Sequence, residues 1–482
     1  MSFSPNLTYF VERMQGVSVN TFKLESMNRD TAVAGQIITF DLPSNAILNL
    51  RSLKVWCNAN ANNGTADIRS RLPPINDLVE RCEVSVGGVI LAQGANYVNV
   101  LNEVQKALGY DDCDPVFGHP EYVRHKSYVN GLDFGNTANE QYASSSINYF
   151  AIDKFHGFLN TAEPKLLDTS LVPDMRVRLY MASNNVLTKS EGVAIGNGPA
   201  RVGPPAFEAG FVKNDNLPAG TAAYQITNIH ATIEAIGLAD TTYDAMLSAQ
   251  MSQAGFLEIP YKDYTSFSEV HSGATRFSVS TQSLDRVWVA WRSNDFDTQF
   301  CPISIDGYKL QGAFITGSYQ DDATAQGAAA SGTTVDLGLP QYDEGGVLDT
   351  NKEKYKSRYF NFAKPNTNMT LQLQLNGAYM PQFPANLGEL YGITKNSLPF
   401  KGLKNVSFNQ YLENYCIQCF RLNMPDSEYS RTISGLDTRA VNLQGVVKTS
   451  GTTGSTNLQI SVFTEQTSCL RVGAGRAIEI IA

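Results

Sequence analysis

Residues 82–104 read CEVSVGGVILAQGANYVNVLNEV, and residues 371–393 read LQLQLNGAYMPQFPANLGELYGI. Each stretch alternates apolar and polar residues, turns at a glycine (Gly88 or Gly377), carries a glutamine five residues later and continues into a helix-like segment. Such alternation is typical of a half-buried strand, and glycine is favoured where a turn needs a positive φ. The two stretches therefore predict that one structural unit occurs twice in the chain.

Period-two alternation recurs along the whole chain, for example at Leu53, Val55 and Cys57, which share one face of a predicted strand. Clusters of Gly, Pro, Asn and Asp separate these stretches, as in an antiparallel sandwich or barrel. Two short amphipathic helices are predicted, over 96–109 and 240–255. Each alternating stretch is predicted to bury one face in a core. The others are MRVRLYMAS (175–183), NIHATIEA (228–235), DRVWVAWRS (285–293), NLQISVF (457–463) and AIEIIA (477–482).

The chain of 482 residues is long enough for about two or three domains. Its texture changes over 184–222, which is rich in Gly, Pro and Asn and marks a domain boundary. A second irregular stretch, 315–336, has almost nothing to bury and is predicted to be a surface loop. The predicted organisation is an N-terminal arm at 1–33, a first sandwich at 34–186, a linker at 187–222 and a second sandwich at 223–482.

Composition excludes several classes of function. The formal net charge is −9 with no basic block, so direct sequence-specific nucleic acid binding is not expected. No apolar run reaches the roughly 18 residues of a membrane span, and no secretory signal is predicted at the N-terminus. Seven scattered cysteines indicate a reducing compartment rather than a disulfide scaffold.

The motifs that resemble chemistry are each better explained by ordinary structure. GNGPARVG (196–203) and VGAGR (472–476) lack the lysine and the following helix of a phosphate-binding loop, and are predicted to be linker and turn. The acidic runs DDCDP (111–115) and NDFD (294–297) do not have the spacing of a calcium loop. SGLDTRA (434–440) is predicted to be a turn with an adjacent ion pair. The histidines are expected to be solvated: His119, His125, His156, His230 and His271.

The only C-x-x-C motif, Cys416 and Cys419 in NYCIQCFRL, is the strongest candidate for a metal or redox site. No second cysteine pair exists to complete a four-cysteine zinc site. If the motif lies in a strand that follows a short helix at 408–415, the two side chains point to opposite faces and cannot share a metal. If 408–422 is one helix, the two would share a face. The strand is the preferred interpretation, so no catalytic, cofactor-binding or metal-ligating residue is predicted, and no cofactor.

Several stretches together resemble the double jelly-roll major capsid proteins of double-stranded DNA viruses, in particular those of virophages and polinton-like viruses. They follow the same order along nearly the whole chain. They are DLVERCEVSVGGVILAQGANYVNVLNEV (77–104), YQITNIHATIEAIGL (224–238), FLEIPYKDYTSFS (256–268), FSVSTQSLDRVWVAW (277–291), SGLDTRAVNLQGVV (434–447) and VFTEQTSCLRVGAGRAIEI (462–480).

The resemblance implies an all-β fold of two tandem eight-stranded jelly rolls, with short helices and long inter-strand loops. It implies a structural protein rather than an enzyme, a homotrimer with a pseudo-hexagonal outline, and an icosahedral virion shell assembled inside the host cell. The implied partners are further copies of the chain, minor capsid and penton proteins, and an internal membrane. The alternative from another class is a tandem jelly-roll carbohydrate-binding protein or glycoside hydrolase, which needs an aromatic platform or paired carboxylates.

Overall fold

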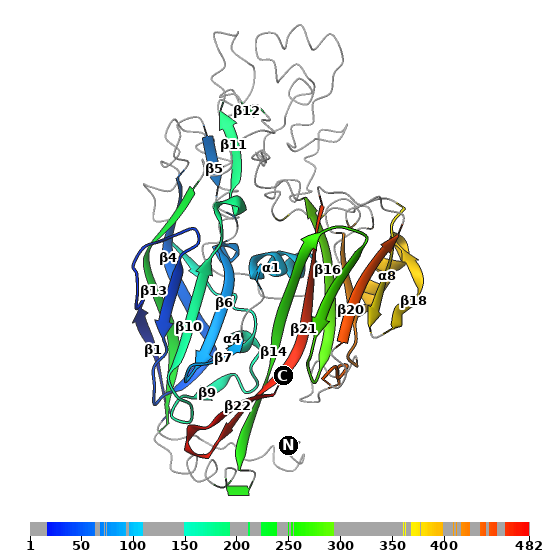
Figure 1. Ribbon diagram of the computed structural model, residues 1–482. Helices are drawn as coiled ribbons and strands as arrows, with labels where there is room; N and C mark the ends of the chain where they lie inside the picture. Colours follow the sequence, from blue (N-terminus) through cyan, green and yellow to red (C-terminus); the bar gives the residue numbers. More distant parts are fainter. Residues whose placement is uncertain are drawn as a thin grey trace, which may run out of the picture.

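In a computed structural model the chain forms two β-sandwiches side by side (Figure 1). The structure describes residues 17–62, 68–71, 75–92, 96–108, 149–192, 211–212, 223–238, 255–293, 368–375, 377–398, 416–424, 434–439, 443–450 and 458–481, with a few single residues between them. All strand pairs described below are antiparallel, as expected for a jelly roll.

The first sandwich consists of two facing sheets. One has the strand order β1-β13-β4-β8, with β2 and β9 pairing beside it, and the other has the order β3-β10-β6-β7. A small third sheet, β12-β11-β5, extends from one end of it (Figure 1). The bounds are β1 Val17–Glu25, β2 Ala32–Val33, β3 Ile37–Asp41, β4 Ile47–Asn62, β5 Ile68–Arg71, β6 Val79–Val86, β7 Val89–Ala92, β8 Tyr149–Ile152, β9 Leu166–Asp168, β10 Met175–Met181, β11 Thr188–Gly192, β12 Phe211–Val212 and β13 Ala223–Leu238, with helices α1 Val98–Ala107 and α4 Phe158–Thr161.

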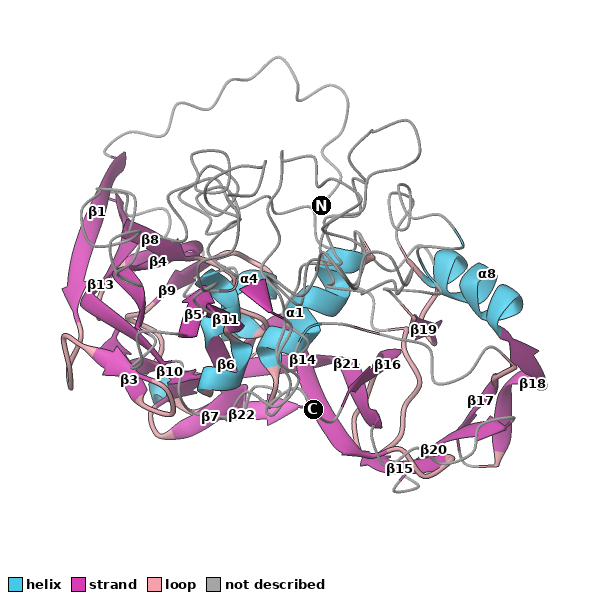
Figure 2. Cartoon of the chain, turned by 90° about the horizontal axis from the view of Figure 1, so that it is seen from above, coloured by secondary structure: helices cyan, strands magenta, loops and turns pink. Residues whose placement is uncertain are grey.

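The second sandwich has the sheets β14-β21-β16-β19 and β15-β20-β17-β18, and β22 pairs with the end of β21. Helix α8 packs against β19 beside this sandwich (Figure 2). The bounds are β14 Phe256–Val270, β15 Ala274–Val279, β16 Leu284–Ser293, β17 Thr370–Leu375, β18 Ala378–Asn386, α8 Leu387–Ser397, β19 Ile417–Arg421, β20 Leu443–Ser450, β21 Leu458–Gly473 and β22 Ile478–Ile481.

The two sandwiches repeat one topology in the same chain order. The two sandwiches have equivalent sheets. The sheet β1-β13-β4-β8 of the first sandwich corresponds, strand by strand, to β14-β21-β16-β19 of the second. The sheet β3-β10-β6-β7 corresponds in the same way to β15-β20-β17-β18. The paired stretches at 82–104 and 371–393 form the equivalent elements β6–β7–α1 and β17–β18–α8, with positive φ at Gly88 and Gly377. The predicted duplication is therefore confirmed at the level of strand order.

This repeat places two strands differently from the sequence analysis. β13 lies between β1 and β4 in the first sandwich, although residues 223–238 were expected to open the second. β1 is the first strand of the same sheet, although it was expected in an arm outside the sandwich. Alternation alone does not reveal which sheet a strand joins, so the change of texture at 184–222 was mistaken for the boundary. We propose that the boundary lies between Leu238 and Phe256.

The predicted inward faces are confirmed for the first sandwich. Leu53, Val55 and Cys57 of β4 are buried, and the alternating apolar residues of β10 and β13 are also buried. The expectation of one exposed face is wrong for β16, in which every residue from Asp285 to Arg292 is buried. Val287, Val289 and Trp291 face the core of the second sandwich, whereas Trp288 and Ala290 join the larger core shared with the first. Contact between the sandwiches covers the second face.

Some predicted elements lie largely or wholly outside the described residues. They include the loop at 315–336, the linker stretch GNGPARVG, the acidic runs at 111–115 and 294–297, and His119 and His125. Of the helix expected at 240–255, Ala249, Ser252 and Gln253 are described and helical, and Gly255 follows with a positive φ. Phe408 and Tyr411 are helical within the expected short helix at 408–415.

Candidate functional site at the joint between the sandwiches

The outer edge of β14 meets the first sandwich through backbone and side-chain hydrogen bonds. The Tyr261 hydroxyl donates to the Leu91 carbonyl of β7 at 2.6 Å. The Glu163 N–H donates to the Pro260 carbonyl at 3.0 Å, and the Lys262 N–H donates to Thr161 Oγ1 at 2.9 Å. The Pro260 carbonyl and the Lys262 N–H lie at the edge of β14 that does not pair with β21. Without these bonds they would be unpaired backbone groups at the edge of the sheet. We call this contact the joint: Leu91, α4 and Glu163 on one side, residues 260–264 of β14 on the other.

Aromatic packing reinforces the joint. The ring of Phe158 in α4 meets the ring of Tyr261 edge to face, with centroids 5.2 Å apart. His156 meets Tyr264 in the same manner at 5.6 Å. Edge-to-face aromatic pairs contribute about 0.5–1.5 kcal/mol beyond the area they bury. His156 was expected to be solvated, but it is only partly exposed, because this ring contact covers it.

A second contact between the sandwiches involves the start of α1. The Arg292 guanidinium lies over the ring of Tyr97 at 5.0 Å from its centroid, and Arg292 Nε donates to Gln459 Oε1 at 2.8 Å. Burial raises the pKa of Glu80 in β6, and the charge of Arg292 partly offsets that rise. Arg292 is 1% exposed, so this cation lies wholly between the sandwiches.

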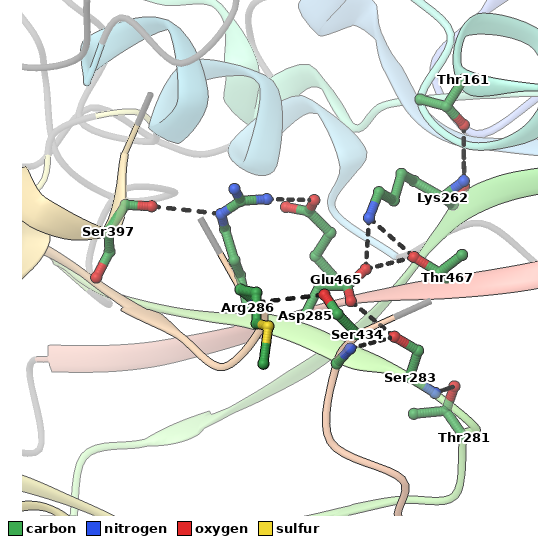
Figure 3. Close-up of polar contacts among 12 residues, drawn as sticks. Thr161, Lys262, Thr281, Ser283, Asp285, Arg286, Ser397, Ser434, Glu465 and Thr467 are labelled. Atoms are coloured by element: carbon green, nitrogen blue, oxygen red, sulfur yellow. Dashed lines mark hydrogen bonds and ion pairs between the residues drawn. The ribbon is translucent and has the colours of Figure 1, made fainter. Parts of the chain in front are cut away.

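Beside the joint, a buried network links β14, β21 and β16 (Figure 3). Lys262 Nζ is 2.5 Å from Asp285 Oδ2 and donates to Thr467 Oγ1 at 2.8 Å, and Thr467 Oγ1 donates to the same carboxylate oxygen. Ser283 Oγ donates to the other oxygen, Asp285 Oδ1, at 2.8 Å, and accepts from the Gly435 N–H at 3.0 Å. Both carboxylate oxygens are thus satisfied, as a buried charge requires.

The second part of the network is a fully buried ion pair. Arg286 Nη1 donates to Glu465 Oε1 at 2.9 Å, and the two side chains are 2% and 0% exposed. Arg286 Nε also donates to the carbonyl of Ser397, the last residue of α8, at 3.4 Å (Figure 3). A cation is favoured at a helix C-terminus because the last carbonyls lack intrahelical partners. Arg286 therefore connects α8 to the sheet that faces the first sandwich.

The C-x-x-C motif lies at the start of a strand, with Cys416 directly before β19 and Cys419 within it, so the prediction of a strand rather than a helix is confirmed. Cys416 belongs to the core of the second sandwich with Phe420, whereas Cys419 belongs to the shared core with Ile417. Both are fully buried thiols. Because the side chains enter different cores, they do not form one metal or redox centre.

The remaining candidates also have structural roles. Asp437 and Arg439 form an exposed two-bond ion pair at 2.7 and 3.1 Å, which holds the pKa of Asp437 at about 2. VGAGR forms the turn between β21 and β22, with positive φ at Gly475. The expectation of a solvated side chain is wrong for His271. It is 3% exposed, and its ring packs edge to face on the ring of Trp291. In the described residues, no group of three or more His, Cys, Asp or Glu side chains could hold a metal.

The sequence analysis did not predict this network, although charged residues within two otherwise apolar strands are a signal for it. Asp285 and Arg286 open an otherwise apolar strand, and Glu465 lies within the strand run ISVFTEQTSCL (460–470). Charges inside a strand that is buried on both faces must pair with one another. Chemically, the network holds β14, β16, β21 and α8 of the second sandwich in one arrangement.

Comparison with known proteins gives no relative by sequence but several by structure. No protein-family model matches the chain, and no curated protein matches it. The PBCV-1 VP54 structure fitted into a reconstruction of the virophage Sputnik matches with a TM-score of 0.53 and 11% identity, over 98% of each chain. The chain has the double jelly-roll fold of viral capsid proteins. The PBCV-1 virus capsid matches at a TM-score of 0.50 and 12% identity, over 98% of each chain. The Faustovirus major capsid protein matches at 0.50 and 11% identity, over 98% of this chain and 93% of that one.

Proposed function

We propose that this double jelly-roll chain is the major capsid protein of an icosahedral double-stranded DNA virus. In this proposal it has a structural rather than an enzymatic role, forms homotrimers with a pseudo-hexagonal outline, and resides in the virion shell after assembly inside the host cell. The observation that carries the proposal is the match of nearly the whole chain, in two repeated sandwiches, to capsid proteins.

The joint supports the same function. A trimer has a six-sided outline only if each chain presents two similar units at a constant angle. The hydrogen bonds at Leu91, Thr161 and Glu163 hold the two sandwiches in one geometry. Rigid units with self-complementary surfaces are what a closed shell requires.

The proposed partners are first of all further copies of the chain, within and between capsomers. Minor capsid and penton proteins and an internal membrane are the remaining proposed partners. Direct sequence-specific contact with nucleic acid is not proposed, because the net charge is −9. Among the described residues, no helix is long and apolar enough to cross a bilayer.

The alternative of a carbohydrate-binding protein or glycoside hydrolase receives no support from the matched structures, which are those of viral capsids and capsid proteins. We do not carry that alternative further.

Sedimentation equilibrium of the purified chain tests the proposal. A homotrimer has a mass of about three times 52.7 kDa and should persist at micromolar concentration. A stable monomer at that concentration would contradict the proposal.

A further inference from the structure

The two sandwiches repeat one topology, but their equivalent first strands have different surroundings. β14 opens the second sandwich, and its outer edge is covered at the joint by α4, Glu163 and Leu91. β1 occupies the same position in the first sandwich, at the outer edge of its sheet. Within the described residues, β1 pairs only with β13, in an unbroken register from Val17↔Leu238 to Glu25↔His230.

The β1 edge carries exposed apolar side chains. Val19 is 61% and Phe22 is 45% exposed, and they point to opposite faces of the strand. An open, regular strand edge with apolar residues is a site at which another chain pairs or packs.

The outer edge of β3, in the same sandwich, is covered by hydrogen bonds from a neighbouring loop. Beside β3, the Met27 N–H donates to the Thr39 carbonyl at 2.9 Å. The Asn28 side chain donates to the Ile37 carbonyl at 2.7 Å and accepts from the Thr39 N–H at 3.0 Å. Asn28 thus replaces a neighbouring strand. Among the described residues, β13 is the strand that pairs with β1, and the outer edge of β1 is the edge that remains to be compared with β14.

The internal repeat identifies the surface that would receive β1. Within the chain, β14 contacts β7 and the segment from α4 to β9. β18 is the equivalent of β7, and Leu91 aligns with Met380. β9 pairs with the start of β4, and Leu436 forms an isolated antiparallel bridge with Leu284 at the start of the equivalent strand, β16. The connection after β19 therefore corresponds to the segment from α4 to β9.

This equivalent surface in the second sandwich is also exposed and apolar. Met424 is 69% and Leu436 is 40% exposed. The Met424 N–H donates to Ser434 Oγ at 3.3 Å, so the two ends of the connection lie together. We call Met424 and Leu436, with the start of β18 that the repeat makes equivalent to β7, the receiving surface. β1 lies at one end of the molecule, and β18 lies at the other (Figures 1 and 2).

We infer that the β1 edge of one copy docks on the receiving surface of the next copy, and so repeats between chains the joint that β14 makes within the chain. The partner is a second copy because the same chain already binds the equivalent strand at the equivalent surface. Contact between different surfaces of identical chains closes into a ring when the rotation allows it. Three copies then give six alternating sandwiches joined by six similar contacts. The inference rests on the proposed trimer and identifies the residues that hold it.

Disulfide trapping tests the contact directly. The test variants combine Phe22→Cys with Leu436→Cys, or Phe22→Cys with Met424→Cys, and the single variants serve as background. The matched control pairs Phe22→Cys with Val270→Cys, because Val270 is also exposed (48%) but lies at the far end of β14. The test pairs should give covalent dimers and trimers on a non-reducing gel after mild oxidation, several-fold above both backgrounds.

A test pair that cross-links no better than the Val270 control, in protein that sediments as a trimer, would overturn the inference and leave the proposed function standing. Wild-type protein that sediments as a monomer would instead contradict the proposed function.

A charge variant gives an independent measurement. The double variant Val19→Asp with Phe22→Asp should shift the sedimenting species from trimer to monomer at micromolar concentration, while circular dichroism and the unfolding temperature stay close to wild type. Val270→Asp, at a similarly exposed position, should remain trimeric. A well-folded Val19→Asp, Phe22→Asp variant that stays fully trimeric would contradict the inference.

Discussion

The Tyr261 hydroxyl donates a hydrogen bond to the Leu91 carbonyl at 2.6 Å. The two residues are 170 positions apart in sequence, and the bond joins the two sandwiches. Tyr261 is 2% exposed, and its ring packs edge to face on Phe158. One side chain therefore provides both a polar and an aromatic contact at the joint. Its removal should loosen the angle between the sandwiches as well as reduce stability.

Tyr261→Phe keeps the ring and removes the hydroxyl. Because the buried Leu91 carbonyl loses its donor, we expect the free energy of unfolding to fall by about 1–3 kcal/mol. Denaturant unfolding measures the change. The control is Tyr379→Phe, since Tyr379 is 39% exposed and its hydroxyl accepts from Lys448 at the surface. Equal losses in the two variants would contradict the role of the joint.

The Arg286–Glu465 pair should be far more sensitive than an exposed pair. Glu465→Gln leaves the Arg286 charge buried without its carboxylate, and loss of one partner of a buried pair costs about 3–5 kcal/mol. In the control Arg439→Met, the exposed pair with Asp437 is removed, and the unfolding free energy should hardly change. A similar result for both variants would show that Arg286 is not held in a dry environment.

Gly435 lies against the network and has no room for a side chain. A Cβ on Gly435 would come within 2.5 Å of Asp285 Oδ1 and closer still to Ser283 Oγ. Gly435→Ala should therefore destabilise the protein by about 1–3 kcal/mol, as overpacking does. The control Gly392→Ala, in α8 with nothing within 4 Å, should stabilise it by about 0.5–1 kcal/mol. Thermal unfolding distinguishes the two, and equal shifts would contradict this packing.

Asp263 should make stability depend on pH. Burial raises its pKa from 3.8 to about 6, although hydrogen bonds from the Tyr264 N–H and Gln466 partly oppose the rise. A carboxyl with a raised folded-state pKa favours folding below its unfolded value, and this contribution is lost as pH rises through about 6. Asp263→Asn should thus gain stability relative to wild type between pH 5 and pH 8, by about 1–2 kcal/mol. Unfolding curves that differ by the same amount at both pH values would contradict the assignment.

The fold class could be predicted from the sequence because alternation reports directly on which side chains face a core. The inward faces of β4, β10 and β13 follow from it, as does the position of Cys419 in β19, with Cys416 directly before that strand. The pairing of β13 with β1 and β4 could not be predicted, because a local pattern contains no information on the neighbouring strand.

The joint could not be predicted for a related reason. Tyr261, Thr161 and Leu91 are ordinary residues in their local stretches, and only the packing of two sandwiches brings them together. Burial of β16 on both faces follows from the same packing, and this explains why Arg286 and Trp288, which share one face of the strand, are both buried.

Electron microscopy of negatively stained, purified protein tests the central claim most directly. The account predicts particles with three-fold symmetry and a hexagonal outline, built from six similar sandwiches. Isolated two-lobed particles, with no three-fold assembly at micromolar concentration, would contradict it.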